Sequence, residues 1–186
     1  MTAADVAAAL APLAPPGAPF IIGVTGSVAV GKSTFAQQLQ GQFEGAELVC
    51  TDGFLHSNAK LEELGRLAAK GAPDTYDHLA LANALSAIRS GPATFPAYSH
   101  VIYDIDPALA RTIAAPDVLI IEGLTLRHPD TGPPDLLDAM IYLDADEADL
   151  ERWYVSRFPE LWAAAERDPT SFYARFRGLD RAQTGD

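Results

Sequence analysis

The sequence is poor in cysteine and in lysine. Cys50 is the only cysteine among 186 residues, which excludes an internal disulfide and a cysteine-based zinc cluster. A single cysteine suits a reducing environment, so we expect a cytoplasmic protein. Lysine occurs only as Lys32, Lys60 and Lys70. The other cationic side chains are arginines, which suit bidentate contacts with phosphate groups.

Positive charge and long apolar runs are also scarce. The formal net charge is −12, whereas a groove for nucleic acid usually has the opposite balance, so we expect no nucleic-acid partner. No apolar run approaches the roughly 20 residues that cross a bilayer, so we expect no membrane span. The apolar start, Met1 to Leu13, contains Asp5 and no early basic residue, which argues against a secretory signal.

Hydrophobic residues make up 48% of the chain and charged residues 20%, which predicts one globular domain over residues 1–186. Within residues 1–19 we expect a short helix from Ala3 to Leu10 and a proline-rich joint from residue 12 onward. Residues 180–186 are expected to form a loose tail.

Apolar runs alternate with segments of helical spacing. We expect strands at Phe20–Val24, Glu47–Thr51, Asp117–Gly123 and Ala139–Leu143, and extended segments with turns at residues 94–114. We expect helices after Lys32 (with Phe35, Leu39 and Phe43 on one face), at Asn58–Lys70, His78–Arg89 and Asp146–Arg157, and intermittently to Leu179. The alternation predicts an α/β fold, a mainly parallel sheet flanked by helices in three layers. In such sheets, ligands bind beyond the carboxyl ends of the strands.

A phosphate-binding motif lies between the first predicted strand and the helix that follows. Gly26-x4-Gly31-Lys32-Ser33 matches the P-loop and has the required context. Its backbone N–H groups and the helix N-terminus attract phosphate, Lys32 reaches the β- and γ-phosphates, and Ser33 can ligate Mg²⁺. The motif predicts a P-loop NTPase fold that binds a nucleoside triphosphate. The predicted nucleotide-binding residues are Gly26, Ser27, Val28, Ala29, Val30, Gly31, Lys32, Ser33 and Thr34.

Two acidic residues end predicted strands. Asp52 follows the second strand and Glu122 ends the strand at 117–123. A carboxylate near a γ-phosphate can take a proton from an attacking hydroxyl or hold Mg²⁺. Equally, Asp52 could open a turn and Glu122 could cap a strand end. The four histidines, His56, His78, His100 and His128, have no recognisable metal-ligand spacing, and Cys50 reads as a small buried residue.

A series of motifs in the expected order resembles bacterial type I pantothenate kinase, in the group of P-loop kinases that also holds uridine kinase and phosphoribulokinase. The matching stretches are Gly26–Thr34, Thr51–His56, Tyr76–Asp77, Tyr98–Asp104, Ile121–Leu124 and Trp153–Phe158. The Tyr98-Ser99-His100 stretch is the most diagnostic of them. The resemblance runs from about Phe20 to about Phe176.

The resemblance implies a role for each matching residue. Lys32 would stabilise the transferring phosphoryl group, Ser33 and Glu122 would serve Mg²⁺, and Asp52 would be the base that faces the acceptor hydroxyl. The acceptor pocket would be lined by Tyr98, His100 and Tyr103 and bordered by Tyr154. Arg157 would reach the phosphates from a lid helix, which makes Lys32, Asp52 and Arg157 the predicted catalytic set.

Two departures from the family pattern carry expectations. Gln37 stands where the family has an arginine that helps to bind coenzyme A, so we expect weak or absent inhibition by coenzyme A. The family continues past the stretch that resembles Asp168–Tyr173 with asparagines that hold pantothenate, whereas this sequence ends at Asp186. We therefore expect an acceptor pocket with part of that wall absent.

The leading hypothesis is an ATP- and Mg²⁺-dependent kinase of a small-molecule hydroxyl, with pantothenate as the first acceptor. The alternatives are another small acceptor, such as a nucleoside, a sugar or glycerate, or a non-catalytic nucleotide-binding relative. The resemblance also implies a homodimer along the P-loop helix. Phe35, Leu39 and Phe43 could serve that interface or face the core.

Overall fold

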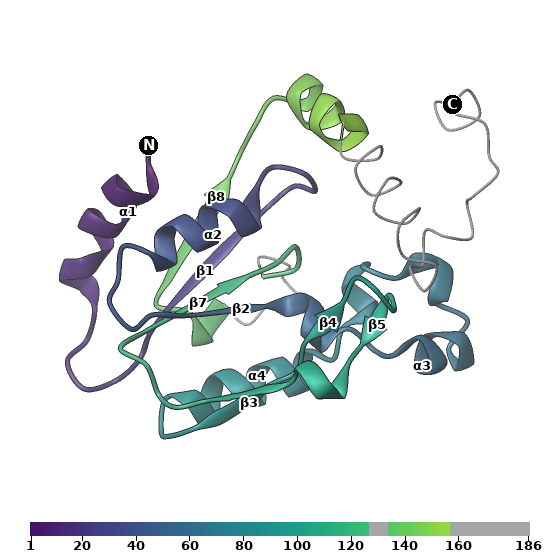
Figure 1. Ribbon diagram of the computed structural model, residues 1–186, viewed down its shortest axis with the longest axis horizontal. Helices are drawn as coiled ribbons and strands as arrows, with labels where there is room; N and C mark the ends of the chain where they lie inside the picture. Colours follow the sequence, from purple (N-terminus) through teal and green to yellow (C-terminus); the bar gives the residue numbers. More distant parts are fainter. Residues whose placement is uncertain (127–133, 157–186) are drawn as a thin grey trace.

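The computed structural model describes residues 1–126 and 134–156 and is built on a four-stranded parallel sheet. The strand order is β2-β7-β1-β8, and all three pairings are parallel. The strands are β1 (Phe20–Gly26), β2 (Glu47–Cys50), β7 (Val118–Glu122) and β8 (Ala139–Leu143). Their carboxyl ends point toward the right-hand side of Figure 1. The predicted parallel sheet is confirmed.

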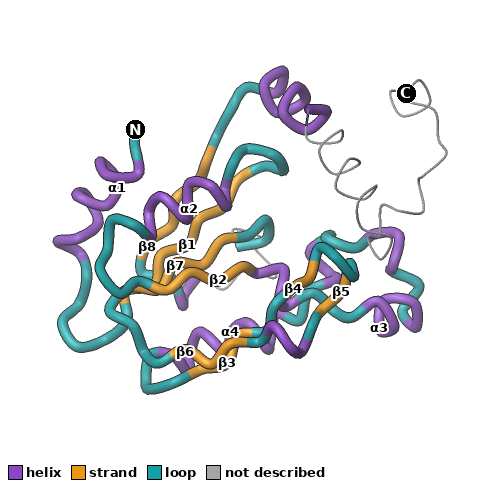
Figure 2. The backbone as a smooth tube through the Cα atoms, in the orientation of Figure 1, coloured by secondary structure: helices purple, strands orange, loops and turns teal. Residues whose placement is uncertain are grey.

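Helices cover both faces of the sheet and form three layers. The helices α1 (Ala3–Leu10) and α2 (Lys32–Gln40) lie on one face, and α4 (His78–Ile88) lies on the other (Figure 2). Successive residues of β1 point to opposite faces, so Ile21 packs in the core with α4 and Ile22 in the core with α1 and α2. Because both faces are buried, β1 and β7 are continuous apolar runs rather than alternating ones.

The first helix has the predicted bounds. Thr2 and Asp5 form a capping box, in which the Thr2 hydroxyl accepts from the Asp5 N–H at 3.2 Å and the Asp5 carboxylate accepts from the Thr2 N–H at 2.8 Å. A helix of eight residues is marginal alone, so its stability comes from burial of Ala3, Val6 and Ala7 in the core shared with α2.

Besides α4, the segment between β2 and β7 contains small elements that lie outside the central sheet. They are α3 (Asn58–Glu63), β3 (Ala93–Phe95), β4 (Tyr98–Ser99), β5 (Asp104–Ile105) and β6 (Arg111–Ile113). The 3₁₀ turns are Ala11–Leu13, Thr51–Phe54 (η2), Leu67–Ala69, Pro73–Thr75, Pro107–Leu109 (η5) and Pro134–Leu136. β3 pairs antiparallel with β6 and β4 with β5, which confirms the extended segments predicted at 94–114.

Several predicted boundaries were wrong. The helix predicted at Asn58–Lys70 ends at Glu63, because Gly65 has φ of 65° and turns the chain out of the helical path. α2 ends at Gln40 before Gly41, so Phe43 lies beyond the helix, although its side chain still packs against the core. β2 stops at Cys50, and β1 continues to Gly26, two residues past the predicted end.

The last described element is a helix over residues 147–156. It begins one residue after the predicted Asp146. Arg157, the helical character predicted to Leu179 and the predicted tail at 180–186 lie outside the described residues, as does His128. None of the helices within 1–126 and 134–156 is long and apolar enough to cross a bilayer.

Candidate active site

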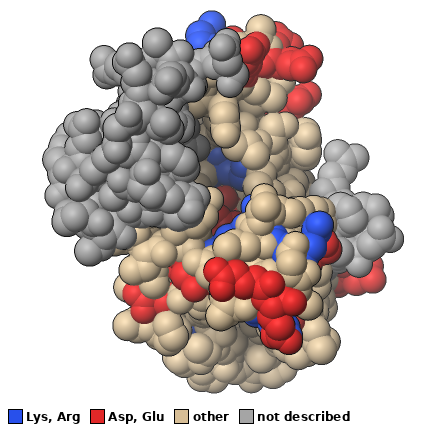
Figure 3. Space-filling model, turned by 90° about the vertical axis from the view of Figure 1, so that its right-hand side faces the viewer, with Lys and Arg blue, Asp and Glu red and all other residues tan. Residues whose placement is uncertain are grey.

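The carboxyl ends of β1, β2 and β7 lie next to one another, so the residues that follow these strands gather on one face. The P-loop follows β1, η2 follows β2, and Glu122 ends β7. Figure 3 views the molecule from this side, and basic and acidic side chains meet in the hollowed centre of the face. The position agrees with the edge at which the fold class places ligands.

The P-loop encloses a hollow of about 340 Å³, which is lined by Ala29, Gly31, Lys32, Ser33 and Thr34. Ala29 has a positive φ of 65°, a conformation that costs a residue with a Cβ and is found at ligand-binding turns. Lys32 begins α2, and its Nζ donates to the Ser27 carbonyl at 2.9 Å across the loop. The N-terminal end of α2 adds a partial positive charge to the same hollow.

The hydroxyl of Ser33 donates to Oε1 of Glu122 at 2.9 Å. This bond joins the start of α2 to the end of β7, and Glu122 is only 8% exposed. Hydroxyl and carboxylate oxygens are ligands that Mg²⁺ accepts, and Mg²⁺ often takes few protein ligands together with phosphate and water. Within the described ranges, no cluster of three or more His, Cys, Asp or Glu side chains offers a fuller cage. The Ser33–Glu122 pair therefore fits a magnesium ion that is shared with phosphates.

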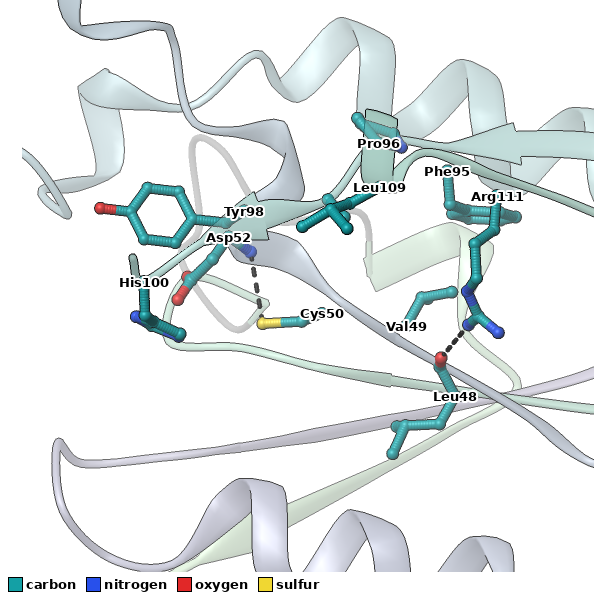
Figure 4. Close-up of a pocket in the computed structure, with 11 residues that line it drawn as sticks. Leu48, Val49, Cys50, Asp52, Phe95, Pro96, Tyr98, His100, Leu109 and Arg111 are labelled. Carbon is teal, nitrogen blue, oxygen red and sulfur yellow. Dashed lines mark hydrogen bonds between the residues drawn. The ribbon is translucent and has the colours of Figure 1, made fainter. Parts of the chain in front are cut away.

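Asp52 lies in η2, directly after β2. The Tyr76 hydroxyl donates to its Oδ1 at 3.1 Å, and the Asp52 N–H donates to Cys50 Sγ at 3.5 Å (Figure 4). Burial raises the pKa of Tyr76, and the nearby Asp52 carboxylate raises it further. The phenol therefore stays protonated and keeps donating, which orients one carboxylate oxygen and leaves the other for a ligand.

Cys50 lies between the two acids and is partly buried. Burial raises the pKa of its thiol, and the charges of Asp52 and Glu122 raise it further. Because the thiolate is disfavoured, Cys50 is a neutral small side chain, which is consistent with its predicted structural role.

Two glycines allow the backbone around Asp52 to pack closely. A Cβ on Gly123 would collide with the side chain of Thr51, and a Cβ on Gly53 would collide with the Pro96 carbonyl. Because these two glycines have no Cβ, η2 can approach the end of β7 on one side and the β3–β4 segment on the other. The two glycines that follow the acids, Gly53 after Asp52 and Gly123 after Glu122, thus help to set the positions of both carboxylates.

The hairpin formed by β4 and β5 brings together three of the predicted acceptor residues. The ring of Tyr98 lies 5.1 Å from that of His100 and 5.8 Å from that of Tyr103, both in edge-on contact. Tyr103 has φ of 56° in the turn, and the Ser99 hydroxyl accepts from the N–H groups of Val101 and Ile102. The predicted set of aromatic residues is therefore one local unit.

Lys70 is a site residue that the sequence analysis did not single out. Its side chain is 6% exposed, and its Nζ donates to Asn58 Oδ1 at 2.6 Å and to the Tyr103 carbonyl at 2.8 Å. The ammonium also lies 4.8 Å and 5.2 Å from the ring centres of Tyr98 and Tyr103. Burial lowers its pKa, while the nearby Asp104 carboxylate opposes that shift. Lys70 thus fixes the turn of the β4–β5 hairpin through its contacts with Asn58, Tyr98 and Tyr103.

The remaining predicted residues lie on or beyond the last helix. Tyr154 is 62% exposed, and Arg157 is outside the described residues. The adjacent Trp153 lines a second hollow of about 340 Å³ beside the P-loop, together with Phe35 and Gln38.

Comparison with known proteins agrees with the site geometry. Residues 21–154 match the phosphoribulokinase/uridine kinase family. The chain is 42% identical to pantothenate kinase of Streptomyces avermitilis in an alignment that covers 90% of this chain and 58% of that protein. It is 44% identical to pantothenate kinase of Mycobacterium sp. (strain KMS) over 177 residues, 89% of this chain and 56% of that one. The chain thus spans less than two thirds of the length of these relatives.

Solved structures share the fold. A protein of Silicibacter sp. TM1040 named as a fructose transport system kinase superposes with a TM-score of 0.78 at 26% identity, over 98% of this chain and 92% of that one. D-glycerate 3-kinase of Cryptococcus neoformans var. grubii superposes with a TM-score of 0.67 at 13% identity, over 94% and 83% of the two chains, and supports the fold alone. Because the family match over residues 21–154 covers most of the chain, the chain belongs to the phosphoribulokinase/uridine kinase family.

Proposed function

We propose that the chain is an ATP- and Mg²⁺-dependent kinase that phosphorylates a hydroxyl of a small molecule, with pantothenate as the first acceptor to test. The observation that carries the proposal is the Ser33–Glu122 bond at the P-loop, next to an Asp52 carboxylate that Tyr76 orients. Nucleotide binding alone does not require Asp52. A carboxylate at that place suits the transfer of a group to a hydroxyl.

In the proposed reaction, the acceptor hydroxyl lies between Asp52 and the γ-phosphate. Its oxygen forms the new P–O bond, its proton passes to the Asp52 carboxylate, and the bond to the β-phosphate oxygen breaks with its electron pair on ADP. Lys32 would leave the Ser27 carbonyl and contact the phosphates. Positioning and neutralisation of charge do most of the work in such transfers.

Ser33 and Glu122 are the residues that would hold Mg²⁺. When bound, the ion neutralises charge on the phosphate oxygens. The base and ribose have room in the hollow lined by Phe35, Gln38 and Trp153, which adjoins the P-loop. Arg157, one residue past the described helix, and Tyr154 on that helix remain proposed contacts for the phosphates and the acceptor.

The acceptor can be identified by following ADP formation with ATP, Mg²⁺ and a panel of pantothenate, uridine, cytidine, glycerate and sugars. Turnover with pantothenate and background rates with the others support the full proposal. Turnover with another compound alone keeps the kinase and changes its acceptor. Background rates with all of them, together with tight ATP binding, would favour a non-catalytic nucleotide-binding protein.

A sugar or a glycerate-like acceptor is the second candidate. The observation that favours it is the similarity to the kinase named for fructose transport, which superposes with a TM-score of 0.78 at 26% identity. Fructose and D-glycerate therefore belong in the panel at the same concentrations as pantothenate.

We also propose a homodimer and a cytoplasmic location, both carried over from the family resemblance and the cysteine content. Leu39 is fully buried in the core beneath α2, so the interface would use the outer side of that helix. Light scattering at several protein concentrations measures the oligomeric state directly.

A further inference from the structure

A cavity of about 150 Å³ begins at Asp52 and runs back along the outer edge of β2. Figure 4 shows Asp52, Tyr98 and His100 at one end of it and Arg111 at the other. The reaction proposed above uses the Asp52 end and leaves the rest of the cavity without a role.

The middle of the cavity is apolar. Val49 of β2, Phe95 of β3 and Leu109 of η5 line it, and Val49 and Phe95 are buried while Leu109 is 48% exposed. A polar group placed between them would lose its water without gaining a partner from these side chains, which is costly. A hydrocarbon group would gain by the same burial.

The far end is closed by a cation whose charge is already balanced. Arg111 Nη2 donates to the Leu48 carbonyl at 2.8 Å, and Nη1 lies 3.3 Å from Glu47 Oε2. The Glu47 carboxylate would repel an anionic group at this end. The chemistry of the cavity is therefore set by its apolar middle and by the carboxylate at its mouth.

The volume defines the size of the group that fits. An apolar cavity of roughly 150 Å³ in another protein binds benzene. The space beside Asp52 thus has room for a compact branched or cyclic group of about six carbon atoms.

We propose that this cavity is an apolar subsite of the acceptor site, and that it takes a compact hydrocarbon group attached next to the hydroxyl that Asp52 faces. The inference rests on the proposed function, because it assumes that Asp52 faces the acceptor. It selects alcohols with an apolar branch over polyols, whose further hydroxyl groups would gain no partner from the three apolar side chains. Leu109, Val49 and Phe95 are the residues that set this preference.

The test is a methyl-detected NMR titration of the whole chain with benzyl alcohol, and with glycerol as the polar control. We expect saturable shifts of the Leu48, Val49 and Leu109 methyl groups with benzyl alcohol, and none with glycerol. Leu109→Trp fills the cavity from its exposed rim and should weaken the affinity for benzyl alcohol at least about tenfold. Leu79→Trp is the matched control, since Leu79 is 72% exposed on α4.

If Leu109→Trp does not fold, contacts measured in the unmodified protein show whether benzyl alcohol binds in the cavity. Nuclear Overhauser effects from the benzyl ring to the methyl groups of Val49 and Leu109 support the subsite. Shifts that do not saturate, or equal weakening by the Leu109 and Leu79 variants, overturn it. These readouts need neither ATP nor turnover. A chain that phosphorylates an acceptor but does not bind benzyl alcohol would refute the subsite alone, whereas saturable binding without transfer to any acceptor would refute the kinase.

Discussion

The Ser33 hydroxyl and the Glu122 carboxylate are joined by a hydrogen bond of 2.9 Å across 89 positions of sequence. Ser33 is placed by the first turn of α2 and Glu122 by the end of β7, so neither oxygen depends on a long loop. Two oxygens held on rigid elements are ready for one cation without rearrangement of the backbone.

Changing either side chain should weaken the binding of Mg²⁺ rather than the fold. For Ser33→Ala and Glu122→Gln we expect the Mg²⁺ concentration at half-maximal rate to rise at least about tenfold, because the first variant loses an oxygen ligand and the second loses the negative charge that attracts the ion. Rates measured across a Mg²⁺ series check this. Ser86→Ala, an exposed hydroxyl on α4 that bonds only its own helix, is the control. Unchanged curves for both site variants would remove the pair from the metal site.

Lys32 and Asp52 should separate phosphate stabilisation from proton transfer. Lys32→Ala should lower the transfer rate by several orders of magnitude, since it removes charge next to the transferring group. Asp52→Asn should abolish transfer while leaving the dissociation constant for ATP within about threefold. Isothermal titration with ATP and a transfer assay measure the two quantities. A collapse of ATP affinity in Asp52→Asn would make that residue a metal ligand or a structural one.

Tyr76 is expected to act through Asp52. Tyr76→Phe removes the bond to Oδ1 but keeps the ring, so we expect kcat to fall about tenfold with the KM for ATP unchanged. Tyr142→Phe on the exposed strand β8 is the matched control. An unchanged kcat in Tyr76→Phe would leave Tyr76 with a packing role alone.

We expect the affinity for the acceptor to fall at alkaline pH, because Lys70 loses its proton there. Burial lowers its pKa below the usual 10.5, so the ammonium loses its proton earlier than an exposed lysine does. Between the lowered pKa and 10.5 the unfolded chain binds more protons, so this group makes the free energy of unfolding rise with pH in that window. The acceptor KM should nevertheless increase there, because the contacts to Tyr98 and Tyr103 weaken.

Lys70→Met should raise the acceptor KM near neutral pH and remove its alkaline increase. Lys60→Met is the control, because Lys60 forms an exposed pair with Glu63 on α3. The acceptor KM measured from pH 7 to 10 for the three proteins distinguishes the cases. Equal alkaline increases in all three would show that Lys70 does not cause them.

Gly123 should tolerate no side chain while Thr51 is opposite. Gly123→Ala should destabilise the protein by about 1–3 kcal/mol and reduce transfer, because the new Cβ forces η2 away from β7. Thr51→Gly removes the three atoms nearest to the new Cβ, so the double variant should recover part of the loss. Gly91→Ala, with open space around its position, should be nearly neutral. Additive losses in the double variant would place the strain elsewhere. Thermal unfolding of the unmodified protein, the two single variants, the double variant and Gly91→Ala measures these stabilities.

The sheet and the phosphate loop could be predicted because their signals are local. The run Phe20–Val24 is apolar at every position except Gly23, and the glycine, lysine and serine that follow must lie at its end. The carboxyl edge then places Asp52 and Glu122 near the P-loop from topology alone. Helix boundaries were less certain, yet Gly65 carried a readable stop signal.

Tyr76 and Lys70 could not be found in the same way. Tyr76 reaches Asp52 because residues 54–56 bond to residues 75–77, which include a Leu55–Tyr76 bridge. Lys70 depends on groups 12 and 33 positions away, Asn58 and Tyr103. Such contacts arise when loops fold against one another, and neither spacing nor hydropathy along the chain reports them.

The pairing of β1 has a consequence for biosynthesis. The strand that leads into the P-loop pairs only with β7 and β8 among the described strands, and both lie more than 90 residues later in the chain. On the ribosome, the first 110 residues would therefore emerge with this apolar strand unpaired. The Ser33–Glu122 pair can form only after residue 122 has left the exit tunnel, so it cannot assist the early stages of folding, and a chaperone has reason to cover β1 until then.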